Sequence, residues 1–282
     1  MSYNIIALGA ESVISFYPIL MKLTTLDVPF NTFIRLSTYF IISLFLANYD
    51  VLKNIGYPKL FILAIINIIH ITSSYHGFKA LNPSLSESLF YTYPFINLIL
   101  TTVFLKETMS YNKLLFIIPI LFCIYNIYSA DQKSEKQNFK LGIPMILLSA
   151  ITESILYIIL KTTDLGTNPW NSILIVYGLA ALLYSVYYLY NNTDNIYGIV
   201  SNNKKEVGLI ILVNIVIGLF GYGLKFATIP KIESTTYSII TYTGILSTLV
   251  FSYIFGIESF GTKKLLFIFG LILSLVSMHF IK

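Results

Sequence analysis

Two glutamates lie inside apolar stretches of the sequence, where an ionised side chain is costly. Glu11 falls about halfway along the first apolar stretch, and Glu153 lies near the middle of the stretch after residue 140. A charge at the bilayer centre costs about 2.5–3.5 kcal/mol even on the insertion scale, so it needs a partner, a cavity or a proton. The bland alternative is a structural carboxylate hydrogen-bonded to neighbouring helices. Because intramembrane acids mark solute and proton pathways, we take both as candidates for substrate binding or proton coupling.

A lysine, a glutamate and a tyrosine recur together in two copies of one motif. The copies read KALNPSLSESLFY at residues 79–91 and KFATIPKIESTTY at residues 225–237, and each ends one apolar segment and begins the next. The recurring residues are Lys79, Glu87 and Tyr91 in the first copy and Lys225, Glu233 and Tyr237 in the second.

Two interpretations fit this motif. As helix caps, its charges would complement helix dipoles, with Ser84 and Glu87 forming a capping box. As gates, the two Lys/Glu sets would lie at opposite membrane faces, around a site centred on the deeper acids. In that case Tyr91 and Tyr237, one helical turn past each glutamate, would contact a solute.

The two mid-segment acids each share a helical face with a base. Spacings of three and four residues place Glu11 and Lys22 on one face of the first helix. The same spacing places Glu153, Tyr157 and Lys161 on one face of a later helix. We therefore add Tyr157 to the solute-binding candidates and both lysines to the gating or charge-pairing candidates.

The remaining candidates are one tyrosine, one arginine and two histidines. Tyr17 joins the solute-binding candidates of the first helix. Arg35, inside the second apolar segment, would pair with a carboxylate, hold an anionic solute or snorkel to the interface. His70 and His76 have neither a Glu-x-x-His pattern nor cysteine partners, so we expect polar interface positions and no metal site.

The composition excludes a soluble protein. Of 282 residues, 56% are hydrophobic and 11% charged, against about 25% charged in a typical soluble domain. The net charge of +5 fits contact with anionic lipid headgroups, and nucleic acid is not an expected partner. Cys123 stands alone, so no disulfide framework is expected. No nucleophile elbow, phosphate-binding loop or zinc signature occurs, so we expect neither an enzyme, nor a cofactor, nor an ATP-driven pump.

The apolar segments predict an all-α membrane protein with ten transmembrane helices. We expect them at residues 3–22, 30–48, 59–78, 84–105, 111–129, 141–160, 170–190, 207–227, 232–255 and 264–281. The first should be a retained helix and not a cleaved signal, because it lacks a basic n-region. A polar linker is expected at residues 130–140, and a polar loop at residues 191–206.

Several sequence matches between the two halves indicate a duplication. FLKETMSYNKLLFI at residues 104–117 matches FGIESFGTKKLLFI at residues 255–268, and Glu11-Ser12 matches Glu153-Ser154. We therefore expect five-helix repeats at residues 1–129 and 141–282. An odd number of crossings per repeat inverts one repeat relative to the other, as in secondary transporters. Lysines divide almost evenly between the loops of the two sides, so charge bias does not choose an orientation.

With this repeat, the chain resembles the EamA-like ten-helix members of the drug/metabolite transporter superfamily. The resemblance rests on an apolar helix with a central proline and a glutamate at its end, LFYTYPFINLILTTVFLKETMS at residues 89–110. The second copy keeps Glu258 but has Thr243-Gly244 in place of the proline. The resemblance implies both termini in the cytoplasm, probable residence in the cell (inner) membrane, and a cavity lined chiefly by helices one to four and six to nine. Helices five and ten would then be peripheral.

These features predict a secondary transporter or exchanger of a small polar metabolite. The paired acids favour a cationic or zwitterionic solute such as an amino acid, amine or nucleoside-like metabolite, as a monomer or homodimer among membrane lipids. Glu11 resembles the first-helix glutamate of small multidrug resistance proteins, which binds protons and cationic substrates, so protons are a candidate coupling ion. Two alternatives stay open. One is a sugar-phosphate-type anion exchanger that uses the lysines and Arg35, and the other is a nontransporting membrane receptor or assembly protein.

Overall fold

The computed structural model describes residues 3–106, 112, 115–131, 137–163, 165–166, 168–228, 231–232 and 234–280, and all its regular elements are helical. The first half contains α1 (Tyr3–Ile14), α2 (Tyr17–Leu23), α3 (Val28–Leu46), η1 (Tyr49–Asn54), α4 (Tyr57–Ala80), α5 (Pro83–Phe90), α6 (Tyr93–Leu105) and α8 (Ile117–Asp131). The second half contains α9 (Phe139–Lys161), α10 (Pro169–Asn202), α11 (Lys204–Val216), η2 (Ile217–Gly223), α12 (Leu224–Thr228), α13 (Ser234–Thr241), α14 (Thr243–Ile254) and α15 (Thr262–Phe280).

Short polar side chains begin several of these helices. Asp27 accepts a hydrogen bond from the backbone N–H of Phe30 and caps α3. Asn138 and Asn168 cap α9 and α10 in the same way. Because the first N–H groups of a helix have no partner within it, these caps fix where each membrane segment starts.

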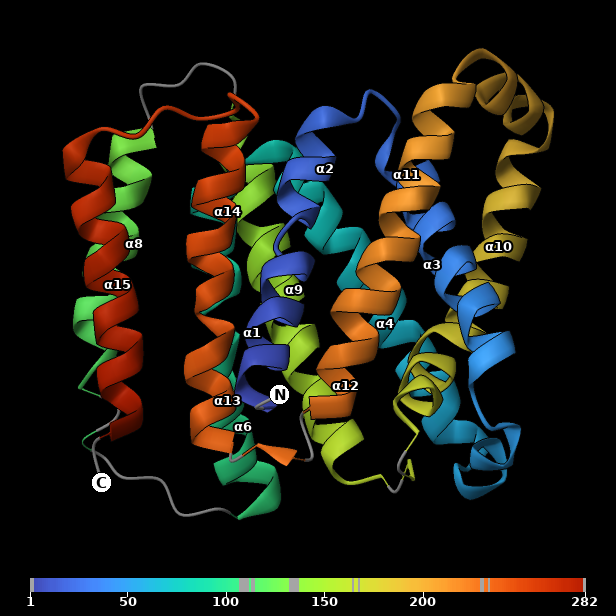
Figure 1. The fold of residues 1–282 in the computed structure, drawn as a ribbon, viewed down its shortest axis with the longest axis horizontal. Helices are drawn as coiled ribbons and strands as arrows, with labels where there is room; N and C mark the ends of the chain where they lie inside the picture. Colours follow the sequence, from blue (N-terminus) through green and yellow to red (C-terminus); the bar gives the residue numbers. More distant parts are fainter. Residues whose placement is uncertain are drawn as a thin grey trace.

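Within the described residues, six stretches are long and apolar enough to cross a membrane: Tyr3–Leu23, Val28–Leu46, Tyr57–Ala80, Phe139–Leu160, Pro169–Asn192 and Lys204–Thr228. Two shorter apolar helices, Ile117–Ala130 and Ile239–Ile254, accompany them. Figure 1 shows these helices side by side in one bundle. The chain is therefore an integral, multi-pass α-helical membrane protein.

Three of the expected continuous helices are broken. The first divides at Ser15–Phe16 between α1 and α2, the fourth at Tyr91–Thr92 between α5 and α6, and the ninth at Tyr242 between α13 and α14. Pro18 and Pro94 are the second residues of α2 and α6. Proline lacks an N–H and clashes with the preceding turn, which explains the first two breaks. The third break has no proline.

Two other elements differ from the expectation. The polar stretch at residues 191–206, expected as a loop, is helical, because α10 continues to Asn202 across a kink at Asn192 and α11 begins at Lys204. The eighth expected helix contains a π-helical segment, η2, in which Gly218, Gly221 and Gly223 lie. A Cβ on Gly221 would lie 2.8 Å from Ile14 Cγ1, so this glycine permits close packing of η2 on α1.

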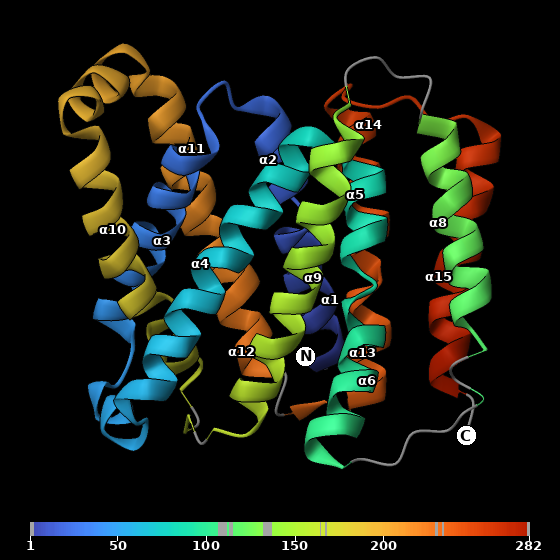
Figure 2. The ribbon, with the colours of Figure 1, turned by 180° about the vertical axis from the view of Figure 1, so that it is seen from behind.

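Helices of the two halves interleave in the core. α4 packs on α9, α3 packs on α10, and α1 packs on η2 and α12. α8 and α15 pack on each other at one edge of the bundle, apart from α1, α4 and α9 (Figures 1 and 2). The edge position of this pair agrees with the peripheral helices five and ten that the family resemblance implies.

Candidate functional site

A buried lysine lies between the two mid-segment acids. Lys225 Nζ, on α12, is 3.3 Å from Glu11 Oε1 and 3.7 Å from Glu153 Oε1. Glu11 is only 1% exposed. A buried ion pair is stable only with good geometry and further hydrogen bonds, so these three side chains form one unit. Lys225, expected in a gate separate from the solute site, belongs to the central cluster, because α12 carries it against α1 and α9.

Two tyrosines complete the surroundings of Glu11. Tyr237 donates a hydrogen bond to Glu11 Oε1 at 2.7 Å, and Tyr91 donates to Oε2 at 3.4 Å. Both hydroxyls come from the repeated motif, one from each half of the chain. With Lys225 they provide the charged and neutral donors that a buried carboxylate requires.

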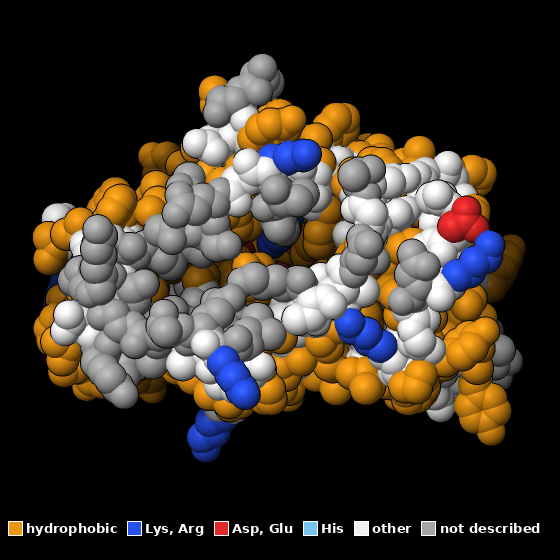
Figure 3. All heavy atoms as spheres, turned by 90° about the horizontal axis from the view of Figure 1, so that it is seen from below, with side chains coloured by type: hydrophobic (Ala, Val, Ile, Leu, Met, Phe, Trp, Pro, Cys, Tyr) orange, Lys and Arg blue, Asp and Glu red, His pale blue; other side chains and the backbone are white. Residues whose placement is uncertain are grey.

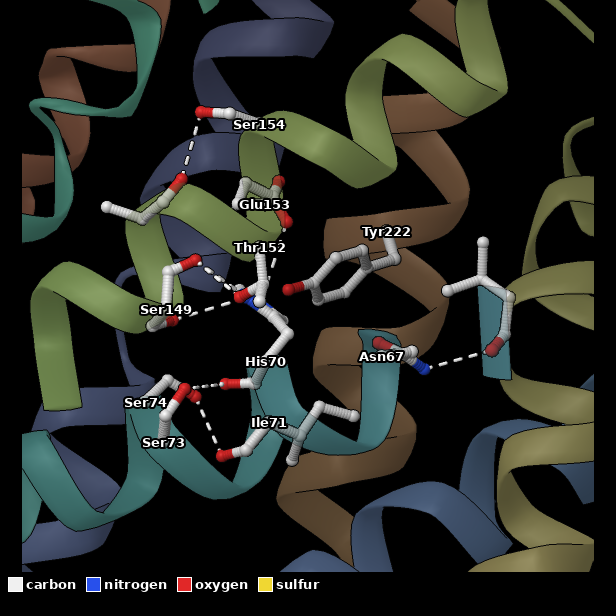
Figure 4. A network of polar contacts seen from close by, with 12 residues as sticks. Asn67, His70, Ile71, Ser73, Ser74, Ser149, Thr152, Glu153, Ser154 and Tyr222 are labelled. Carbon is white, nitrogen blue, oxygen red and sulfur yellow. Dashed lines mark hydrogen bonds and ion pairs between the residues drawn. The ribbon is translucent and has the colours of Figure 1, made fainter. Parts of the chain in front are cut away.

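Glu153 pairs with a histidine on α4 (Figure 4). His70 Nε2 is 3.5 Å from Glu153 Oε2, and His70 Nδ1 lies 3.1 Å from the Ser149 carbonyl and 3.2 Å from the Ser149 hydroxyl. If Nδ1 donates to the carbonyl, Nε2 either carries a second proton or accepts one from the carboxyl. If Nδ1 accepts from the hydroxyl, Nε2 carries the proton of the neutral ring. The tautomer and protonation state of His70 therefore decide whether Nε2 donates a hydrogen bond to Glu153.

Arg35 lies in a cage of tyrosine rings. Its Cζ atom is 4.0 Å from the Tyr17 ring centroid, and its guanidinium donates to the hydroxyls of Tyr222 at 2.8 Å and Tyr177 at 3.2 Å. The rings of Tyr39 and Tyr75 lie within 5.7 and 5.4 Å of Cζ. Arg35 is 1% exposed, so it does not snorkel. Cation–π contacts replace a counter-ion, since no carboxylate pairs with Arg35 among the described residues.

Tyr222 connects the two buried cations. Its hydroxyl accepts from Arg35, and its ring centroid is 5.9 Å from Lys225 Nζ. In Figure 4 its side chain extends towards His70 and Glu153. Tyr222 lies in the π-helical segment, and π-bulges are frequent at functional sites because they shift the side-chain register. In this position the Tyr222 side chain contacts both Arg35 and Lys225, and it thereby links Arg35 to the cluster of Glu11, Lys225 and Glu153.

The three helix breaks meet beside Glu11. The Ser15 hydroxyl lies 3.4 Å from the Tyr91 hydroxyl, and Thr248 of α14 donates to the Ser15 carbonyl at 3.0 Å. A Cβ on Gly244 would touch the Tyr91 hydroxyl and lie 2.7 Å from Ser15 Oγ. Gly244 thus lies near the position that corresponds to Pro94 in the first half. Because it has no side chain, α13 and α14 can approach the other two breaks closely.

Hydrogen bonds close the end of the molecule at the top of Figure 1. Glu206 of α11 accepts from the Thr24 hydroxyl, the Thr25 hydroxyl and the Thr25 N–H, each at 2.7 Å. Lys22 donates to the carbonyl of Lys79, and Lys79 donates to the carbonyl of Leu26. Lys22 therefore does not share a face with Glu11, because the break at Ser15 separates α1 from α2.

The expected capping box at α5 is wrong. The Ser84 hydroxyl and N–H both donate to Glu258, at 3.1 and 3.3 Å, so a glutamate from the other half caps this helix. Glu87 is buried, its Oε2 has no hydrogen-bond partner, and Lys79 does not pair with it. The motif thus contributes to two places, the closed end through Lys79 and the core through Glu87 and Tyr91.

The opposite end is hollowed. Figure 3, seen from below, shows a depression near the middle of this surface with basic side-chain atoms inside it. The buried charged cluster thus lies in a bundle that is sealed by hydrogen bonds at one end and indented at the other.

The remaining candidates are placed as follows. Tyr17 contacts Arg35 and donates to Asn214 at 3.0 Å, so it belongs to the tyrosine cage. Tyr157 is partly buried, one turn beyond Glu153 on α9. Glu233 and the side chain of Lys161 lie outside the described residues. In the part of the chain that is described, no three His, Cys, Asp or Glu side chains are grouped to hold a metal ion.

Sequence reasoning missed the partners in this site. His70 was expected only at a polar interface, and Tyr39, Tyr75, Tyr177 and Tyr222 were not distinguished among 22 tyrosines. One signal was available for His70, because it lies inside an apolar segment, where polar groups need partners. Nothing in the spacing of the tyrosines identifies those around Arg35, since they come from α2, α3, α4, α10 and η2.

The fold and this buried cluster define a class, a polytopic membrane protein with a charged site inside its helical bundle. The model of the EamA-like transporter family matches residues 1–129 and again residues 140–280. The chain belongs to this family of membrane transporters, within the drug/metabolite transporter superfamily.

One solved crystal structure of a protein superposes with a TM-score of 0.64 over 98% of this chain and 94% of that chain, at 10% sequence identity. This similarity supports the fold alone. No curated protein sequence matches the chain.

Proposed function

We propose that this protein is a secondary active transporter that moves a small zwitterionic metabolite of the amino-acid type by alternating access. The observation that carries the proposal is the Lys225 ammonium between the buried Glu11 carboxylate, at 3.3 Å, and the partly buried Glu153 carboxylate, at 3.7 Å. The ammonium occupies the position that a solute amine would take. Solute binding would displace Lys225 and change the packing of α12 on α1.

Arg35 favours a zwitterion over a simple amine. Its guanidinium is buried among tyrosines, and its Nε has no hydrogen-bond partner. A solute carboxylate would accept charge-assisted hydrogen bonds from Arg35 while the solute amine replaces Lys225. Tyr222, in contact with both cations, would lie between the two ends of the solute.

Protons are the coupling ion we propose. His70 Nε2 lies 3.5 Å from Glu153 Oε2, where the two side chains would share a proton, and Glu153 also faces Lys225. A solute amine that replaces Lys225 beside Glu11 but not beside Glu153 would leave Glu153 without its cation and favour a proton shared with His70. Proton uptake and solute binding would then be linked through one side chain.

The anionic alternative receives less support. A sugar phosphate would need several free cations, but Lys22 and Lys79 donate to backbone carbonyls, and Lys225 is offset by two acids. Among the described cations that we considered for that role, only Arg35 has neither a carboxylate nor a backbone carbonyl as a partner, since its guanidinium donates to tyrosine hydroxyls. The nontransporting receptor predicts no saturable flux at all, which separates it from both transport proposals.

We further propose ten membrane spans arranged as two inverted repeats around the linker at residues 130–140. The packing supports this arrangement, because contacts occur in equivalent couples. α1 of the first half packs on η2, α12, α13 and α14 of the second half. α9 of the second half packs on the matching helices of the first half, α4, α5 and α6. An even number of spans would place both termini on one side, which we assign to the cytoplasm of the cell membrane.

Thermal shifts of the purified protein test the solute class. We expect an amino acid to raise the Tm, and its methyl ester and its N-acetyl derivative to raise it less, because each lacks one charge. Saturating solute, at about 100 times Kd, stabilises the folded state by about 2.7 kcal/mol. Glu11→Gln should lose the response, and Asp50→Asn, on the exposed η1, should keep it. A shift by a sugar phosphate alone, or an unchanged response in Glu11→Gln, would refute the proposal.

A further inference from the structure

A second cavity lies away from the central site. It has a volume of about 730 Å³ and is lined by residues from the start of α3 and from α4, α9 and α10. It shares no residue with the Glu11, Lys225 and Glu153 cluster. Its volume falls within the range of about 300–1,000 Å³ that is typical of ligand pockets.

This cavity is open to the outer surface of the helix bundle. Tyr187, on its wall, is 61% exposed, and its neighbour Tyr190 on the same helix is 85% exposed. Figure 2 shows α4 and α10 on this face of the molecule, with α9 beside α4. We call the cavity the lateral crevice, since a molecule in the bilayer reaches it without entering the central site.

The lining of the lateral crevice changes from polar to apolar with depth. Asp27 caps the start of α3, His76 lies one turn before the end of α4, and Asn191 and Asn192 lie at the kink of α10. Further along α4 the lining is apolar at Ile68 and Ile69, and Met145 and Leu148 of α9 add apolar side chains near the level of His76. Eight residues of α4 separate His76 from Ile68, which is about 12 Å at 1.5 Å per residue. This gradient matches an amphipathic molecule standing along the membrane normal.

Two residues that line the crevice have buried hydroxyls without a hydrogen-bond partner. Tyr188 is 1% exposed, and its hydroxyl has no hydrogen-bond partner, nor does the hydroxyl of Thr72. Ring stacking with Phe33, at 5.0 Å between centroids, holds the Tyr188 ring in place. Buried hydroxyls are normally hydrogen-bonded, so an acceptor from a bound molecule is the missing partner.

The charge of the crevice selects the headgroup. Asp27 supplies a carboxylate at the polar end, and no lysine or arginine is among the described residues that line the crevice. Tyrosine rings beside a carboxylate favour an ammonium group. We infer that the lateral crevice binds an ethanolamine phospholipid. Its ammonium lies at Asp27, its ester oxygens accept from Tyr188 and Thr72, and one acyl chain fills the apolar depth.

Short-chain lipids and the full-length protein in detergent test this inference. Dioctanoyl phosphatidylethanolamine should raise the Tm in a saturable manner, and dioctanoyl phosphatidylglycerol should not. Asp27→Asn should remove this preference while keeping the α3 cap, since asparagine caps helices as well as aspartate. Tyr188→Phe should raise the half-saturating concentration about 2- to 10-fold, the equivalent of one hydrogen bond.

The exposed Tyr190→Phe variant is the matched control and should respond as the wild type does. Equal shifts by both lipids, no shift by either, or an unchanged preference in Asp27→Asn would overturn the inference. Failure of this test leaves the central site untouched, because none of its residues line the crevice.

Discussion

Lys225 determines the charge balance of the buried site. It faces two carboxylates, and Glu11 receives hydrogen bonds from Tyr237 and Tyr91 as well. Removal of one member of a buried ion pair costs about 3–5 kcal/mol, because the remaining charge is left without compensation. The lysine and the two glutamates should therefore depend on one another strongly in mutational cycles.

A double-mutant cycle measures this dependence. Lys225→Met should lower the Tm markedly, because two carboxylates then face each other without a cation. Adding Glu11→Gln should restore part of the loss, so the two effects should not be additive. Thermal unfolding of the detergent-purified variants gives the coupling. Lys53→Met, at an exposed position, should leave the Tm unchanged, and strict additivity of the two core changes would contradict the pairing.

The depth of Glu11 and Glu153 was predictable from the cost of a charge in an apolar segment. Their shared partner was not, because Lys225 reaches them only through the register of η2 and the short α12. The tyrosine cage of Arg35 was not predictable from the sequence either, because its tyrosines come from five different elements. Apolar periodicity predicts which segments cross the membrane, but not how one helix rotates against another.

At the scale of elements, broken helices bring the site together. The breaks at Ser15–Phe16, Tyr91–Thr92 and Tyr242 lie next to Glu11 and its two tyrosines. Irregular backbone at membrane depth is tolerated where protein surrounds it or it lines a cavity. Two of these breaks follow from prolines in the sequence, and the third has Gly244 beside it, where an added Cβ would meet Tyr91 and Ser15.

Gly244 should tolerate no side chain. Gly244→Ala would press a methyl group onto the Tyr91 and Ser15 hydroxyls, and overpacking of this kind costs about 1–3 kcal/mol. Tyr91→Phe in the same chain should recover part of the loss, because it removes the closest atom. The Tm of each variant measures both effects.

Gly208→Ala is the matched control. Gly208 lies in α11 with no atom within 4 Å of an added Cβ, so alanine should be neutral or stabilise the helix by up to about 1 kcal/mol. Equal effects of the two alanine substitutions would show that Gly244 is not a close contact.

At the scale of the whole molecule, neither half has a complete core. α4 packs on α9, α3 on α10 and α8 on α15, and each pair joins one helix from each half. The central cluster also takes Glu11 from one half and Lys225 and Glu153 from the other. The two matches of the family model thus describe two halves of one unit.

Separate expression of the halves tests this mutual dependence. Residues 1–134 alone should not yield a stable membrane protein, because the faces of α1, α3 and α4 would lack their partners. Co-expression with residues 135–282 should restore a complex that purifies together, since the cut lies in a polar segment between α8 and α9. A monodisperse, stable fragment 1–134 would contradict the account.

Uptake into proteoliposomes tests the central claim most directly, that Glu11, Lys225 and Glu153 form the solute site. The measurement uses a radiolabelled amino acid chosen by the thermal-shift panel, with wild type, Glu11→Gln and the exposed control Asp50→Asn reconstituted at equal density. We predict saturable uptake by the wild type and by Asp50→Asn, and none above empty vesicles for Glu11→Gln. Uptake by Glu11→Gln at the wild-type rate would contradict the assignment of this site.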